Sequence, residues 1–158
     1  DIELIGDAIG AGAEARAITA EMQSQIDSIS AAAAQGEAPT VYYELDYFDG
    51  ASYAPAPESF VADMIALAGG EPVTTGDPAA FQMPIERLVE LDPAVIVLGD
   101  AMFGHCPDSV AARPGWGGLS AVTGDAVRPL DGTLVTLPAP RLPLGLASLA
   151  RAIDPEKG

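Results

Sequence analysis

Two carboxylates, Glu44 and Asp46, stand two residues apart where a run of β-forming residues, Thr40 to Tyr43, comes to its end. Side chains at i and i+2 of an extended strand point to the same face, so we expect both carboxylates on one face. Such a pair could act as acid and base, or could bind a hard cation. The alternative is that both are hydrogen-bonded or solvated residues at a strand end.

A second candidate for chemistry is the adjacent pair His105-Cys106, which contains the only histidine and the only cysteine of the chain. A complete zinc site needs three or four ligands, and a nucleophile needs a base held beside it. The chain also lacks a P-loop, a Gly-x-Gly-x-x-Gly helix opening and a Gly-x-Ser-x-Gly elbow. We therefore predict no metal site, no cofactor and no enzymatic activity. The alternative is a small metal- or tetrapyrrole-handling enzyme lobe that uses Glu44, Asp46 and His105.

Aromatic residues are the more suggestive feature, because they gather in segments that follow expected strands. They are Tyr47, Phe48, Tyr53, Phe103 and Trp116. Aromatic loops at one edge of a sheet suit a large, flat or amphipathic ligand. The alternative is packing beneath the loops, above all for Trp116.

The elements that must position these residues are set by the stretch from 85 to 100. Leu88, Val89 and Leu91 place apolar side chains on one face of a short helix, which Asp92-Pro93 ends. Residues 95–98 then form an apolar β-branched run, typical of a strand covered on both faces. Ligands bind parallel α/β sheets at the carboxyl ends of such strands, so residues 100–107 lie at the edge of a candidate site.

Hydrophobic periodicity and breakers predict the remaining elements. The expected helices cover 13–34, 59–67 (capped by Ser59) and 142–153, with helical turns at 109–112 and 119–122. The expected strands cover 40–46, 73–75, 127–130 and 134–137. The segments 1–12, 47–57 and 76–84 are expected to be irregular. We predict an α/β fold: a three-layer α/β/α lobe with a small, mainly parallel sheet, preceded by a long helix. The helix region is 1–36 and the lobe is 37–158, in one compact unit.

Composition restricts the classes of partner. The 158 residues are 49% hydrophobic and 19% charged, typical of a globular domain. Seven basic residues against 23 acidic ones give a net charge of −16, which repels nucleic acid. We expect no membrane span, because no apolar run reaches about 18 residues. The first residues lack the basic region of a signal peptide, so we expect an excised or mature piece.

An ordered set of short motifs resembles the periplasmic cobalamin, haem and iron-siderophore substrate-binding proteins of ABC importers. The motifs are Val41-Tyr-Tyr-Glu-Leu-Asp46, Glu58-Ser-Phe60, Ala68-Gly-Gly70, Ile85-Glu86, Leu91-Asp-Pro93, Val95-Ile-Val-Leu98, Arg113-Pro-Gly-Trp116, Ala121-Val122 and Pro140-Arg141. The resemblance implies two α/β lobes joined by a long helix. This chain would supply that helix and the C-terminal lobe, with an N-terminal lobe as its partner, in an extracytoplasmic location (periplasmic, or lipid-anchored at the cell surface as a lipoprotein).

The resemblance also implies a function and the residues that perform it. The lobe would bind a corrinoid, haem or a ferric siderophore through the loops after the first and central strands, and would dock on the importer permease. The implied ligand-binding residues are Glu44, Asp46, Tyr47, Tyr53, Met102, Phe103 and Trp116. Glu86 would dock on the permease, on the side of the lobe away from the ligand loops. Leu137 stands where many members carry a ligand-facing arginine, and Arg141 is expected to cap or pair within the fold.

Overall fold

The computed structural model describes residues 2–77 and 81–156. Its helices are α1 (Ile2–Ala8), α2 (Gly12–Ala33), α3 (Phe60–Leu67), α4 (Ile85–Leu91), α5 (Pro107–Ala111), α6 (Ser120–Thr123), α7 (Thr133–Thr136) and α8 (Leu142–Ile153), with a 3₁₀ turn η1 (Ala101–Phe103). Its strands are β1 (Thr40–Glu44), β2 (Asp46–Phe48), β3 (Ala51–Tyr53), β4 (Glu71–Pro72), β5 (Gln82–Met83), β6 (Val95–Leu98) and β7 (Val127–Pro129).

The centre of the lobe is a parallel sheet in the order β4-β1-β6-β7. The run Val95–Leu98 is buried along its whole length and pairs with β1 in register from Val41↔Val95 to Glu44↔Leu98. Pro129 lies on the edge strand β7, where its missing N–H costs no ladder bond. The predicted parallel α/β sheet is therefore confirmed.

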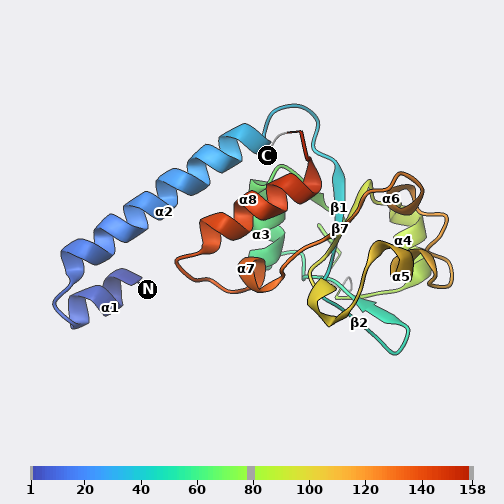
Figure 1. Cartoon of the computed structure of the whole chain (residues 1–158), viewed down its shortest axis with the longest axis horizontal. Coiled ribbons are helices and arrows are strands. Elements are labelled where there is room, and N and C mark those ends of the chain that lie inside the picture. The colour runs from blue at the N-terminus through green and yellow to red at the C-terminus, as the bar shows by residue number, and fades with distance from the viewer. Residues whose placement is uncertain (1, 78–80, 157–158) are drawn as a thin grey trace.

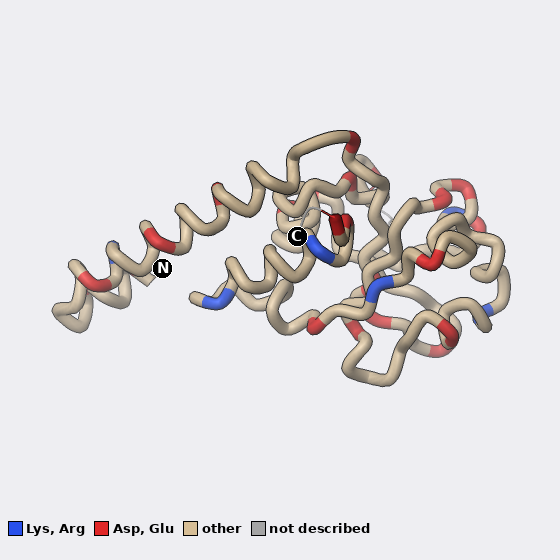
Figure 2. The backbone as a smooth tube through the Cα atoms, turned by 45° about the horizontal axis from the view of Figure 1, so that its top comes forward, with Lys and Arg blue, Asp and Glu red and all other residues tan. Residues whose placement is uncertain are grey.

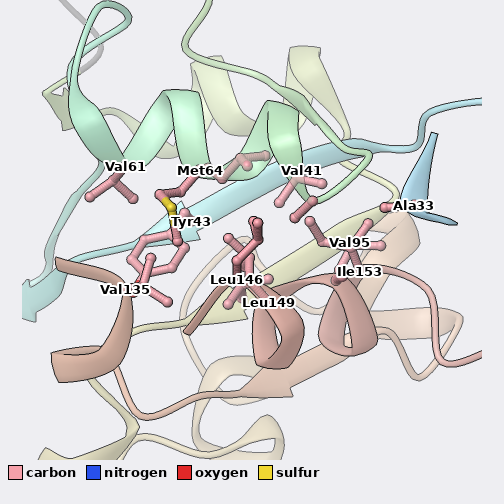
Figure 3. Close-up of a cluster of buried hydrophobic side chains, with 14 residues drawn as sticks. Ala33, Val41, Tyr43, Val61, Met64, Val95, Val135, Leu146, Leu149 and Ile153 are labelled. Carbon is pink, nitrogen blue, oxygen red and sulfur yellow. The ribbon is translucent and has the colours of Figure 1, made fainter. Parts of the chain in front are cut away.

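Helices cover both faces of this sheet, which confirms the three-layer architecture. On one face, α3 and α8 pack against alternate strand residues, with Tyr43, Met64, Leu146 and Leu149 fully buried (Figure 3). On the other face lie α4, α5 and α6 (Figure 1), where Tyr42, Leu88 and Ile96 form a second cluster with Trp116. The alternation of Tyr42 and Tyr43 between the two clusters follows from the period of two in a strand.

The predicted start and stop signals of two helices are confirmed. The Ser59 hydroxyl accepts the backbone N–H of Ala62 at the start of α3. Asp92 ends α4 in the left-handed region (φ 38°), and its carboxylate accepts the backbone N–H and the hydroxyl of Ser120. Val89 is half-exposed, so its predicted place on the buried face of α4 is wrong.

The long helix α2 extends well beyond the lobe (Figure 1). Its C-terminal part packs against α3 and α8 through Ile26, Ile29 and Ala33, whereas Ile18, nearer the N-terminal end, is 45% exposed. Residues 2–8 form α1, which folds back on α2, so the prediction of an irregular 1–12 is wrong there. The backbone at Gly6 comes so close that a Cβ there would lie 2.3 Å from that of Ala15.

Three further predictions are wrong. The segment 134–137 is not a strand: residues 133–136 form α7, where Thr133 donates from its backbone N–H and its hydroxyl to the Asp131 carboxylate. Residues 73–75 form a turn, and the strand that pairs with β1 lies just before them, in β4 at Glu71–Pro72. The segments 47–57 and 76–84 contain β2, β3 and β5, which form an antiparallel sheet; residues 78–80 of the second lie outside the described residues.

Candidate functional site

The candidate site lies at the carboxyl edge of the parallel sheet, where β1 and β6 end side by side at Glu44 and Leu98. The β2–β3 hairpin follows β1, and η1 follows β6. The hairpin turn is Asp49-Gly50, both with positive φ (51° and 79°), as a two-residue type I′ turn requires. Both expected ligand loops are therefore brought to one edge, with β2 at the lower side of the lobe in Figure 1.

A buried ion pair underlies this edge. Arg113 donates to both carboxylate oxygens of Glu44, from Nη1 to Oε2 at 2.7 Å and from Nη2 to Oε1 at 2.9 Å. Both side chains are almost fully buried. The Ser52 hydroxyl of β3 also donates to Glu44 at 2.7 Å and lies 2.6 Å from the Tyr42 hydroxyl. Burial raises the pKa of Tyr42 above its usual range, so this network carries the Glu44 charge and not a phenolate.

The Arg113 guanidinium also joins the two ligand loops. Its Cζ lies 3.6 Å from the centre of the Tyr47 ring on β2, and 4.7 Å from the centre of the Trp116 ring. On the other side, Arg113 Nη2 lies 3.4 Å from Nδ1 of His105, in the segment after η1. One buried cation therefore holds the end of β1, the hairpin and the loop after β6 together.

Asp100 is a buried carboxylate without a hydrogen-bond partner in the described part of the chain. The imidazole of His105 lies beside it, with Nε2 at 3.5 Å from Asp100 Oδ2. Burial, and then the negative charge of Glu44, raise the pKa of Asp100 to about 6. The backbone of Asp100 pairs with that of Asp131, which brings the end of β7 to the same edge.

Above this buried layer, large apolar side chains stand free of the core. Phe48 at the hairpin is 70% exposed, and Met102 and Phe103 of η1 are 64% and 73% exposed. A hollow of about 510 Å³ adjoins η1, with a rim that includes Met102, Leu130 and Thr133. Exposed aromatic and thioether groups on a rigid base are suited to contact a large apolar or amphipathic surface.

The structure places the seven predicted ligand residues at this edge, in different environments. Tyr47 and Tyr53 are half-buried, the latter against Phe81 with ring centres 5.6 Å apart. Trp116 is in the core, packed edge-on against Tyr42 and Tyr47, as the alternative interpretation held. The remaining four are the exposed Met102, Phe103 and Asp46 and the buried Glu44.

The prediction that Glu44 and Asp46 share one face is wrong. Glu44 is the last residue of β1 and is buried, whereas Asp46 is exposed and begins β2 after the chain has turned at Leu45. Because the Glu44 carboxylate is committed to Arg113 and Ser52, the two carboxylates and His105 do not form an acid–base group. Across residues 2–77 and 81–156, no three His, Cys, Asp or Glu side chains gather closely enough to hold a metal ion.

Glu86 is exposed in the first turn of α4. The preceding Ile85 lines a hollow of about 260 Å³ together with Gly50 and Ala51 of the hairpin. The start of α4 is thus beside the hairpin, whereas the Glu86 side chain is exposed to solvent, and its place away from the ligand loops stays a prediction.

Sequence reasoning missed the role of Arg113 and Asp100 at this edge. Arg113 stands directly before Pro-Gly-Trp in the sequence, but its pairing with Glu44 spans 69 residues and leaves no local pattern.

Among the described residues, the helices lack the combination of length and hydrophobicity that a membrane-spanning helix needs.

The chain was compared with known proteins. A family model described as periplasmic binding protein matches residues 1–133. The uncharacterized ABC transporter substrate-binding lipoprotein YvrC of Bacillus subtilis (strain 168) is 30% identical over 158 residues, which are 98% of this chain and 49% of that protein. The chain thus spans about half the length of this relative.

Solved structures show the same fold at lower identity. The periplasmic haem-binding protein BhuT, in complex with two haems, superposes with a TM-score of 0.86 at 19% identity, over 99% of this chain and 61% of that one. An ABC-type Fe³⁺-hydroxamate transport system protein from Saccharomonospora viridis DSM 43017 gives a TM-score of 0.77 at 21% identity, over 97% and 53%. With the match of the family model to most of its length, the chain belongs to the periplasmic binding protein family.

Proposed function

We propose that this chain is the C-terminal lobe of an ABC-importer substrate-binding protein, one that captures a large metal chelate outside the cytoplasm. The observation that carries the proposal is the set of exposed apolar side chains, Phe48, Met102 and Phe103, gathered at the carboxyl edge of a parallel sheet. The similarity to a substrate-binding lipoprotein and to haem and Fe³⁺-hydroxamate proteins supports the class of ligand. A corrinoid remains a further candidate.

Recognition would take place on the exposed layer, while the buried layer keeps that surface in shape. Phe48 and Phe103 come from separate loops, and each would lose most of its exposed area against a flat ligand. Arg113 fixes both loops through Tyr47 and His105, which limits the conformational entropy that binding must remove. Since the chain spans about half of YvrC and 61% of BhuT, we propose that a second lobe closes over the other side of the ligand.

The permease would be met by Glu86, which is exposed on α4 and unpaired among the described side chains. An exposed carboxylate on a strongly acidic protein is steered toward a cationic surface. We expect Glu86→Ala to weaken docking on the permease, by about 1–3 kcal/mol if the pair is partly desolvated, and to leave ligand affinity unchanged. Unchanged docking together with a lowered melting temperature would instead assign Glu86 to its own helix.

The ligand proposal is tested by calorimetric titration of the native-length protein with haem, cobalamin, cobinamide and ferric siderophores. The Phe103→Ala variant should lose about tenfold in affinity for the ligand that binds, because it removes a large contact that the fold does not need. Val89→Ala is the matched control, since Val89 is also half-exposed but lies on α4. Failure of every chelate to bind would refute the proposal, as would equal effects of the two substitutions.

A further inference from the structure

From the charges of the site edge we infer that the lobe selects neutral or cationic chelates and rejects those with free carboxylate or other anionic groups. This inference rests on the proposed function, since it concerns the ligand of that same edge. It goes further by stating the charge class of the ligand.

Besides Glu44, four described carboxylates lie at the carboxyl edge of the sheet. Asp46 and Asp49 are exposed on the hairpin, and Asp131 is exposed on the rim of the hollow beside η1. Asp100 is buried next to η1, and neither of its oxygens accepts a hydrogen bond from the described residues. His105, with Nε2 at 3.5 Å from Asp100 Oδ2, offsets this buried carboxylate only in part, because burial still raises its pKa.

Among the described residues, most arginines of the lobe are paired or lie away from this edge. Arg113, which lies beneath the edge, is neutralised by Glu44. Arg128 of β7 donates to the carbonyl oxygen of Asp125, toward the amino end of its strand. Arg151 lies in the last turn of α8, next to Ile153, which packs against Gly70 at the opposite edge of the sheet.

The other arginines change this balance little. Arg16 pairs with Asp7 at 3.2 Å on the part of α2 that leaves the lobe, and Arg87 on α4 pairs with Glu90 at 3.0 Å. Hydrogen bonds from Thr133, and to a smaller degree the charge of the exposed Arg141, lower the pKa of Asp131, so Arg141 partly offsets one carboxylate. Figure 2 shows how few basic positions stand among the acidic ones over the chain as a whole.

A ligand carboxylate brought to this edge would therefore be desolvated next to like charges and would find little to pair with. A neutral chelate escapes that repulsion, and an ammonium or amide N–H on the ligand can face Asp131 or Asp46. His105 does not reverse the balance, because its Nδ1 faces Arg113 and its Nε2 faces Asp100.

The test uses probes that share one shape and differ in charge, titrated calorimetrically into the native-length protein. Ferrioxamine B carries an ammonium tail, its N-acetyl derivative is neutral there, and its N-succinyl derivative carries a carboxylate on the same chelate. Cyanocobalamin with its monocarboxylic acid, and haem dimethyl ester with haem, are the corresponding corrinoid and tetrapyrrole pairs. In the series that binds, we expect the member without the carboxylate to bind about tenfold tighter at low salt, with a smaller ratio at 0.5 M salt.

Two substitutions test whether the acidic residues of this edge cause the preference for chelates without a carboxylate. Asp131→Asn and Asp46→Asn should each reduce the ratio about threefold, whereas Glu71→Gln should not, because Glu71 begins β4 at the opposite edge of the sheet. Equal or tighter binding of the anionic member would overturn the inference and leave the proposed function standing. Failure of all three series to bind would overturn the proposed function, and the inference with it.

Discussion

Replacement of Arg113 by Met removes the cation that holds Glu44 at the end of β1. The methionine keeps much of the apolar stem of the side chain but leaves the carboxylate buried, with Ser52 as its remaining side-chain donor. Loss of one partner of a buried ion pair costs about 3–5 kcal/mol, mainly because the other charge stays buried and uncompensated. For a domain of this size, each kcal/mol lowers the melting temperature by about 2–4 °C, so a decrease of about 6–20 °C is expected.

Substitution of the partner residue, Glu44→Gln, should lower the free energy of unfolding by less than Arg113→Met does. Arg113 would then keep its contacts with the rings of Tyr47 and Trp116, at 3.6 and 4.7 Å from the ring centres. The amide oxygen of the introduced glutamine would still accept a hydrogen bond from the guanidinium. In the double variant neither member of the pair leaves a buried charge, so the two costs should not add. We expect a coupling energy of at least about 2 kcal/mol in favour of the double variant.

The measurement is urea unfolding of the wild type, both single variants and the double variant, followed by far-UV circular dichroism at pH 7. Arg87→Met is the matched control, since Arg87 forms solvent-accessible ion pairs with Glu90 at 3.0 Å and Asp77 at 3.7 Å, each worth less than about 1 kcal/mol. Additive costs in the cycle, or a cost for Arg113→Met no greater than that for Arg87→Met, would refute the assignment of the pair as the hub of the site.

Three further changes have expected outcomes. The pKa of Asp100 is about 6 in the folded state and about 4 in the unfolded state. The free energy of unfolding is therefore highest below pH 4, and about 2–3 kcal/mol of it is lost as the pH rises through 6. Asp100→Asn should abolish this loss between pH 4 and 7 in urea unfolding, while Asp131→Asn should keep it. Gly132→Ala should cost about 2 kcal/mol, because its Cβ would lie 2.1 Å from the Gly99 carbonyl oxygen; a cost below 0.5 kcal/mol would contradict that contact. Leu149→Ala, in the core under α8, should cost about 2–5 kcal/mol by thermal unfolding, and a smaller loss would mean that the site collapses around the cavity.

Much of the fold could be predicted because its strongest signals are local. The run 95–98 is continuous and β-branched, and the helix 142–153 has its apolar residues on one face, so both were found within a residue of their bounds. The hairpin was not predicted although Asp49-Gly50 is the type I′ signature, because Pro55 and Pro57 favour an irregular segment over the same stretch. The segment 134–137 looked like a strand, but the bonds of Asp131 to Thr133 start a helical turn there.

The meeting of the two expected loops at one sheet edge was predicted, but the contacts beneath those loops were not. Residues after two parallel strands must meet at one edge, so Tyr47, Met102 and Phe103 could be selected by position alone. The assignment of Glu44 to the ligand, rather than to Arg113, shows what position leaves open. Whether a carboxylate faces ligand or interior depends on a partner that is distant in sequence, and hydrophobic periodicity carries no information about such partners.

In the proposed function, the residues that stabilise this edge of the lobe lie beneath the residues that would contact the ligand. The charge of Glu44 is satisfied beneath the surface by Arg113, which lets Tyr47 and the loop after β6 keep their positions without help from the apolar residues at the rim. Phe48 and Phe103 can then remain 70% and 73% exposed at little cost to the fold. Substitutions of the rim should therefore change affinity and not melting temperature, whereas substitutions of the buried pair should lower both, because the rim loses its support. This arrangement would suit the proposed binding and release of a large ligand, since the exposed residues can lose or gain a contact while the buried pair keeps the lobe folded.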